Sequence, residues 1–281
     1  MNKPTPQGPA RWWVALDGVQ PENTRVEAVH AALSHWFDSD AAQHSCGIKP
    51  YSITPITHRR GSFGVEIGTL SAQATVSLLR SAESGRPVRF DAVRAHVSAP
   101  PTMLLSETWA DLATYSGAYA WEFAYQTPMT IHSGQRYSPL PVPASFLGRL
   151  ERLWNAHADH DPIELTREDR RDVWVSALAG ESVQMQLSIG RRAHTRGRSR
   201  PTPVTVSGLE GNVSYRCSEP ETAAKVDRLL RFAVYAGTGA LTEHGLGVSR
   251  LLAIKTRSNR PGPQASPVVV EAAPSRLETT P

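Results

Sequence analysis

Four glycines within eleven residues make GTGALTEHGLG, residues 237–247, the stretch of this chain with the clearest potential for chemistry. Glycine has no side chain, so its backbone can approach a phosphate or another chain segment closely. A dinucleotide-binding fingerprint needs the order strand, glycines, helix, whereas these glycines follow an expected helix and precede an expected strand. A Walker-type phosphate loop is also excluded, because the chain has no Gly-Lys dipeptide.

A second candidate for chemistry is the basic run GRRAHTRGRSR, which ends at residue 200. Such a run is either a solvated loop or a patch that neutralises the phosphates of a nucleic acid and releases their counterions. The residues alone leave both readings open. The arginines of the run are Arg191, Arg192, Arg196, Arg198 and Arg200.

The strands and helices that are expected to position these residues occur in the same order in both halves of the chain. In the first half, RWWVALDGV reads as a strand, and Thr24 and Glu27 have the spacing of a capping box that opens a helix. Two strand-like runs, KPYSITPI and SFGVEIGTL, a helix near residues 71–81 and the strand VRFDAVRAHV follow. The order β-α-β-β-α-β is that of a ferredoxin-like unit.

The second half repeats this order from the strand AYAWEFAYQ onward. Its last helix is expected to open at Ser218 and Glu221, another capping-box spacing, and to stop at Gly237. We therefore predict an α+β fold of two tandem ferredoxin-like (βαββαβ) domains. The expected limits are 10–112, 118–257 with the glycine-rich loop, and a flexible tail at 258–281.

The composition of the chain and the lengths of its apolar runs exclude some classes of function. With 40% hydrophobic and 20% charged residues, the chain is expected to bury a core. No apolar run approaches the roughly 18 residues that cross a bilayer, so we expect no membrane partner and a cytoplasmic location. Cys46 and Cys217 lie in no metal-ligand spacing, and neither a disulfide framework nor a metal site is indicated.

Written by its fixed positions, the glycine stretch is GxGxxTxxGxG, formed by Gly237, Gly239, Thr242, Gly245 and Gly247. This pattern resembles the C-terminal glycine-rich loop of the CRISPR-associated endoribonuclease family numbered six. That family belongs to the repeat-associated mysterious protein superfamily, which is built from two ferredoxin-like halves. The run FAYQTPMTIHSGQRYSPLPVPASFLGRLERLWN is similar to the family's strand with a Thr-Pro pair and helix ending in Trp-Asn, and KPYSITPI is similar to its Tyr-Ser strand.

The resemblance implies a metal-independent endoribonuclease, without a cofactor, that cleaves CRISPR precursor RNA within each repeat. A ribose 2′-hydroxyl attacks the neighbouring phosphate and leaves a 2′,3′-cyclic phosphate and a 5′-hydroxyl. Such a reaction needs a group that exchanges protons near neutral pH, for which histidine is suited, and a cation that stabilises the transition state.

The resemblance also implies where these groups lie. His44 occupies the place, after the first helix and before the Tyr-Ser strand, where many family members carry a catalytic histidine. Lys49 stands where the family can place a supporting lysine, and His30 stands where a relative can carry a tyrosine. His35 could exchange roles with His30. A solvated loop histidine, a half-buried helix histidine and a surface lysine are the alternative readings of His44, His30 and Lys49.

The implied partner is CRISPR repeat RNA, as precursor and as mature guide RNA, with subunits of a CRISPR effector complex as further partners. The arginine run and the smaller basic turn at Arg59 and Arg60 are then expected to contact RNA phosphates. Monomer and homodimer both stay open. The glycine-rich loop carries Glu243 and His244 where many relatives have Lys or Arg, so we expect it to form an RNA-side or interdomain packing surface.

Two other functions remain as alternatives. One is a non-catalytic RNA-binding scaffold subunit of a CRISPR effector complex. The other is a small-molecule enzyme that uses the glycine loop for a nucleotide, which both failed nucleotide fingerprints disfavour.

Overall fold

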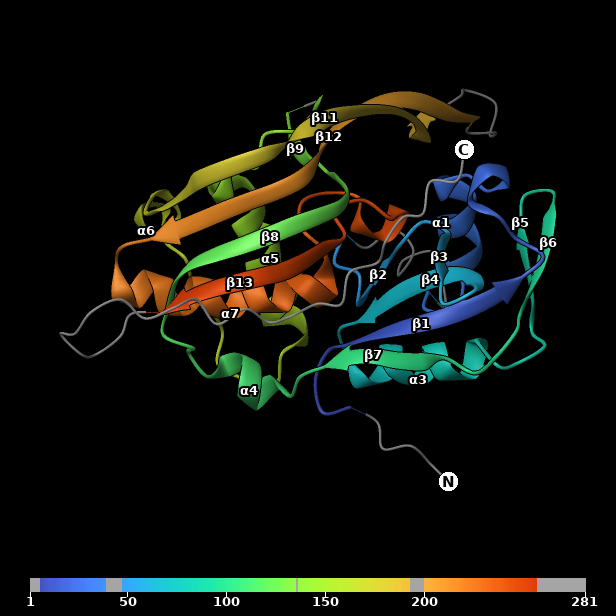
Figure 1. Cartoon of the computed structure of the whole chain (residues 1–281), viewed down its shortest axis with the longest axis horizontal. Helices are drawn as coiled ribbons and strands as arrows, with labels where there is room; N and C mark the ends of the chain where they lie inside the picture. The colour runs from blue at the N-terminus through green and yellow to red at the C-terminus, as the bar shows by residue number, and fades with distance from the viewer. Residues whose placement is uncertain (1–5, 39–46, 135, 193–199, 257–281) are drawn as a thin grey trace.

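The computed structural model describes residues 6–38, 47–134, 136–192 and 200–256. Their strands form two large sheets that lie side by side, with helices behind them in the view of Figure 1. We call the elements up to Ala113 the N-terminal half and those from Ala118 onward the C-terminal half.

The N-terminal half holds a sheet whose main strands follow the order β2-β4-β1-β6-β5, with β3 pairing β4 and β7 pairing β1. The elements of this half are β1 (Ala10–Asp17), η1 (Pro21–Asn23), α1 (Val26–Ser34), β2 (Tyr51–Ile53), β3 (Thr57–Arg59), β4 (Ser62–Thr69), α3 (Ala72–Ser81), β5 (Pro87–Phe90), β6 (Val93–Val97), β7 (Thr102–Ser106) and α4 (Trp109–Ala113).

The C-terminal half holds a four-stranded antiparallel sheet of order β11-β12-β8-β13, and a small sheet of β9 and β10. Its elements are β8 (Ala118–Met129), β9 (Ile131–Ser133), β10 (Arg136–Ser138), α5 (Pro143–His157), α6 (Arg167–Arg171), β11 (Val173–Arg192), β12 (Arg200–Cys217), α7 (Pro220–Ala236), η2 (Thr242–His244) and β13 (Ser249–Thr256).

Both halves have the strand order of a ferredoxin-like unit. In each, the first strand of the βαββαβ series lies between the third and the fourth, as β1 lies between β4 and β6 and β8 lies between β12 and β13. The predicted α+β fold of two tandem ferredoxin-like units is therefore confirmed. The exact domain limits stay a prediction.

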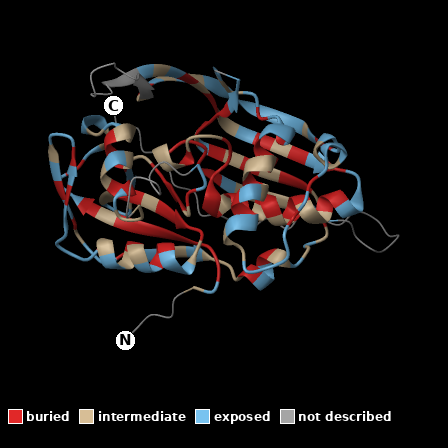
Figure 2. Cartoon of the chain, turned by 180° about the vertical axis from the view of Figure 1, so that it is seen from behind, coloured by how far each residue is buried: buried red, intermediate tan, exposed pale blue. Residues whose placement is uncertain are grey.

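In the C-terminal sheet, apolar residues alternate along the central strand and bury one face, whereas the central strand of the N-terminal sheet is buried nearly throughout. In β8, Trp121, Phe123 and Tyr125 point into the core formed with α5 and α7. In β1, Trp12, Val14 and Leu16 lie in a second cluster. Figure 2, seen from behind, shows in red the buried stretches of the strands and helices.

Both capping-box predictions are wrong. The N-cap of α1 is Arg25, and the Thr24 hydroxyl donates instead to the carbonyl of Gln20. Glu27 accepts from the backbone N–H of Ser188 on β11, in the other half of the molecule. The N-cap of α7 is Glu219 rather than Ser218, because Pro220 takes the first helical position, which suits a residue without an N–H.

The two halves meet where β1, β2 and β4 approach the end of α7. Ser52 Oγ donates to the carbonyl of Tyr235 at 2.7 Å, and Nε of the buried Arg11 donates to the carbonyl of Val234 at 3.1 Å. Gly68 on β4 faces the same turn of α7, and a Cβ there would overlap the carbonyl oxygen of Tyr235. The closeness of this contact requires glycine at position 68.

We expect Gly68→Ala to destabilise the protein by about 1–3 kcal/mol, because the added methyl group overpacks this contact. Chemical denaturation measures the change. Gly148→Ala is the matched control: a Cβ at Gly148 in α5 meets Arg170 at an ordinary 3.6 Å, so the better helix propensity of alanine should raise stability by roughly 0.5–1 kcal/mol. Equal effects of the two substitutions would contradict this account of the contact.

Candidate active site

The glycine-rich segment, residues 237–247, folds back onto the end of β8. The Gly247 N–H donates to the carbonyl of Pro128 at 3.0 Å, and the Thr238 N–H donates to the carbonyl of Gly247 at 2.8 Å. Gly247 has φ +65°, and a Cβ there would overlap the Thr238 carbonyl oxygen. The backbone of the segment therefore packs closely against protein.

The other side of the segment packs on the N-terminal half. Gly245 has φ +89°, and a Cβ there would lie 2.9 Å from Cδ of Pro55. From the C-terminal half, Arg149 of α5 donates to the Thr242 hydroxyl at 2.6 Å. Of the two expected surfaces, the structure thus supports an interdomain packing surface.

His30 of α1 is held by this segment. Its Nδ1 lies 3.0 Å from the carbonyl oxygen of Glu243, and its ring stacks on that of His244 with centroids 3.9 Å apart. A carbonyl oxygen only accepts hydrogen bonds, so Nδ1 carries a hydrogen in this contact. The segment therefore fixes both the orientation and the tautomer of His30.

Glu243 places a buried carboxylate beside His244. Burial alone would raise the pKa of Glu243, but the interactions of its carboxylate with His244 and Arg149 outweigh it and lower the pKa to about 2. Oε1 of Glu243 lies 3.4 Å from Nδ1 of His244. Glu243 is therefore an ionised carboxylate near neutral pH.

Lys49 forms a buried ion pair with Asp38. The Nζ–Oδ2 distance is 2.7 Å, the two side chains are 7% and 4% exposed, and the Tyr51 hydroxyl donates to the same oxygen at 3.3 Å. Burial and, after it, the charge of Asp38 raise the pKa of Tyr51. Asp38 precedes and Lys49 follows residues 39–46, so this pair ties together the two ends of the segment that carries His44.

The remaining predicted site residues are distributed as follows. His44 lies outside the described residues, as do Arg196 and Arg198. Arg191, Arg192 and Arg200 belong to the paired ends of β11 and β12, and their side chains are not described.

In the smaller basic turn, Arg59 is tied to Glu66 at 3.2 Å, a carboxylate that also pairs with Arg11. Arg60 is exposed, with φ +49°. The ion pair leaves Arg59 less available to a phosphate than Arg60.

Four side chains that the fold brings here were not predicted as site residues. Glu243 and His244 were noted as departures from the glycine motif but given no role in the site, while Asp38 and Arg149 carried no sequence signal. A further histidine, His157 at the end of α5, hydrogen-bonds to the backbone of Lys49, and its pKa is lowered by burial, an effect that this hydrogen bond opposes.

Among the described residues, no group of three or more His, Cys, Asp and Glu side chains could hold a metal ion. In the same part of the chain, no helix is long and apolar enough to cross a membrane.

We expect Glu243→Gln to lower the free energy of unfolding near neutral pH by roughly 1–3 kcal/mol, because a buried charged hydrogen-bond partner is lost. The pKa of Glu243 in the folded protein, about 2, lies below the ordinary 4.5. The stabilisation should therefore be full above pH 4.5 and be lost as the pH falls toward 2. Urea unfolding of both proteins across this range measures it, with the exposed Glu164→Gln as control. A pH-independent difference would contradict the assignment.

Comparison with known proteins gives a match between residues 123–249 and the family model of the CRISPR-associated endoribonuclease Cas6. The matched stretch contains the glycine-rich segment, on which the resemblance was based. A comparison with curated proteins finds no significant match.

Three solved structures share the fold over most of the chain. A Cas6 (TTHA0078) product complex is 20% identical, with a TM-score of 0.68, and the match covers 86% of this chain and 98% of that one. A substrate mimic complex of the same protein is 19% identical, with a TM-score of 0.64 and coverage of 87% and 99%. A product complex of Thermus thermophilus Cas6 (TTHB231) is 19% identical, with a TM-score of 0.64 and coverage of 88% and 100%. The C-terminal half of the chain thus matches the family model of the CRISPR-associated endoribonuclease Cas6, and most of the chain shares the fold of solved Cas6 structures.

Proposed function

We propose that this protein cleaves CRISPR precursor RNA within its repeats, without a metal ion, by attack of a ribose 2′-hydroxyl on the adjacent phosphate. The products are mature guide RNAs with 2′,3′-cyclic phosphate and 5′-hydroxyl ends. The observation that carries the proposal is a histidine of fixed tautomer, His30, held by the family's glycine-rich segment. The family match to an endoribonuclease and the substrate mimic and product complexes of structural relatives support it.

The reaction requires two proton transfers, each with its own group. One group accepts the proton of the 2′-hydroxyl as its oxygen bonds to phosphorus, and another gives a proton to the 5′-oxygen as the phosphorus–oxygen bond breaks. We assign one of these transfers to His44. His30, with Nε2 as its exchanging atom and ionised Glu243 beneath its stacked partner His244, is suited to support the other.

For Lys49 we propose a different role from the one expected. Its ammonium group is engaged by Asp38 and is nearly excluded from solvent, so direct contact with the scissile phosphate would break a buried ion pair. We therefore assign Lys49 as a positioning residue, which acts on His44 by holding the ends of residues 39–46 together.

We assign the contact with repeat RNA, both as precursor and as mature guide RNA, to the paired strands β11 and β12 and to the arginine run between them. β11 and β12 continue as a two-stranded ribbon beyond the last pairing with β8, at Leu209 and Met129. A ribbon of this kind can lie along an RNA stem and present arginines to its phosphates.

We expect His44→Ala to slow cleavage of a repeat RNA by at least about 10²-fold, since general acid–base catalysis contributes about 10²–10⁴-fold. The repeat of an array that lies beside the gene is the substrate, and the assay contains EDTA. Wild-type products should carry a cyclic phosphate, measured by mass spectrometry of the ends. The exposed His160→Ala is the control. Full activity of His44→Ala, or an absolute need for Mg²⁺, would overturn the mechanism.

We expect Lys49→Met and Asp38→Asn each to lower kcat with little change in KM, because each removes the ion pair between the residues that flank the segment carrying His44. Lys49→Arg, which keeps the charge, should restore part of the rate. The matched control is Arg25→Ala, which removes an ion pair with Asp91 whose side chains are 67% and 57% exposed, and such pairs contribute little. Circular dichroism confirms that each variant is folded. Folded Lys49 and Asp38 variants with wild-type kcat would refute the positioning role.

A further inference from the structure

The face of the C-terminal sheet turned away from α5 and α7 carries an unusual row of side chains. Trp174 pairs with Arg216, Arg216 with Ala120, and Ala120 with Lys255, so one row crosses all four strands. Directly paired residues of antiparallel strands point to the same face. Three strand spacings of about 4.8 Å set Trp174 and Lys255 roughly 14 Å apart.

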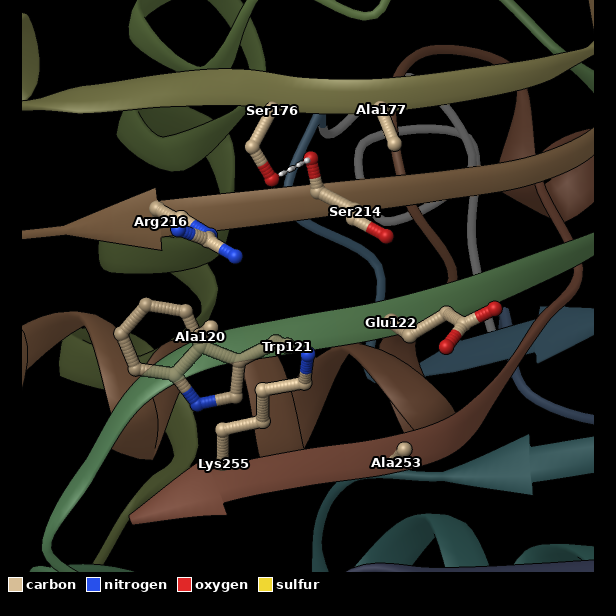
Figure 3. Close-up of a pocket in the computed structure, with 9 residues that line it drawn as sticks. All are labelled: Ala120, Trp121, Glu122, Ser176, Ala177, Ser214, Arg216, Ala253 and Lys255. Carbon is tan, nitrogen blue, oxygen red and sulfur yellow. Dashed lines mark hydrogen bonds between the residues drawn. The ribbon is translucent and has the colours of Figure 1, made fainter. Parts of the chain in front are cut away.

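This row borders a hollow in the sheet surface. The hollow has a volume of about 180 Å³ and is floored by small residues, among them Ala120, Ala177 and Ala253. Figure 3 shows Arg216 and Lys255 toward one end of it and Glu122 toward the other. Small side chains in the middle of a sheet leave room for a flat group between the longer ones.

The row combines an exposed aromatic side chain with two positive charges that form no salt bridge within the described residues. Trp174 is 42% exposed, an unusual fraction for a large aromatic side chain. Within the described residues, no salt bridge engages Arg216 or Lys255, although Arg170, Arg231 and Lys225 of the same half all have acidic partners. Aromatic side chains flanked by cations match the alternating bases and phosphates of single-stranded nucleic acid.

We propose that this face binds a single-stranded segment of RNA, with a base stacked on Trp174 and adjacent phosphates on Arg216 and Lys255. Glu122, the one acidic residue of the hollow, disfavours a phosphate at its own end and can accept from the amino group of a base. The inference rests on the proposed function, because it takes the RNA substrate as the ligand and adds a second contact surface for it.

The new surface is separate from the candidate active site. Pro128, which accepts from Gly247, stands eight residues from Ala120 along β8, or roughly 26 Å at about 3.3 Å per residue. RNA that reaches both must therefore extend by several nucleotides beyond the cleavage site. The surface is expected to contribute affinity for unpaired flanking RNA rather than catalysis.

Binding of a fluorescein-labelled oligouridylate of about 20 nucleotides, longer than a typical single-strand site, tests the proposal by anisotropy. Trp174→Ala should weaken binding roughly tenfold, and Trp174→Phe should restore most of it, because stacking needs only an aromatic ring. Arg216→Ala with Lys255→Ala should reduce the slope of log affinity against log salt concentration by about 1.4, at about 0.7 per lost phosphate contact.

The control is Arg94→Ala, which removes an exposed arginine of β6 in the N-terminal half and should leave oligouridylate affinity unchanged. Wild-type affinity and salt slope in the Trp174 and Arg216/Lys255 variants would overturn the inference. The proposed function is judged separately by cleavage of repeat RNA. Cleavage with unchanged oligouridylate binding in these variants refutes only the inference, whereas impaired binding without any cleavage by the wild type refutes only the function.

Discussion

The hydrogen bond between Nδ1 of His30 and the carbonyl oxygen of Glu243 joins residues 213 positions apart, and the geometry of the candidate site depends on it. The carbonyl reaches His30 because the backbone turns at Gly245 and Gly247, both with positive φ. Side chains at these glycines would meet Pro55 and the Thr238 carbonyl. The glycine spacing is therefore a requirement of close packing, at Gly245 against the N-terminal half and at Gly247 within the segment itself, and this packing places the carbonyl that holds His30.

The charged groups of this region are nearly all balanced by a partner. Glu243 has His244 and Arg149 nearby, and Asp38 has Lys49 and Tyr51. Burying such groups costs solvation energy that pairing only offsets, so these pairs are weak evidence for a gain in stability. Their effect is to fix orientation: a buried charge can satisfy its hydrogen bonds in few arrangements, and side chains that share it are held in one of them.

The sequence predicted the fold because the patterns that mark strands and helices lie within short stretches of the chain. Alternation of apolar residues in β8 and the helix stop at Gly237 can be read within a dozen residues, and both hold in the structure. Glu27 shows where prediction from local patterns fails. Its spacing from Thr24 is that of a capping box, but its carboxylate accepts from Ser188, 161 residues away. The pairing of Lys49 with Asp38 and the contact of His30 with Glu243 depend likewise on tertiary packing, which a single sequence does not display.

The position of the β11–β12 ribbon depends on the glycine-rich segment as well. Where β11 and β12 extend beyond β8 they form a two-stranded ribbon, and such a ribbon is marginally stable by itself in water. Leu187 and Val206 of this ribbon pack on Leu246 of the segment, and Ser188 bonds to Glu27 of α1. In Figure 1 the ribbon accordingly reaches over the N-terminal half. A segment that orients His30 on one side thus supports the β11–β12 ribbon on the other, so displacement of the segment would disturb both the proposed RNA contact and the proposed proton transfer.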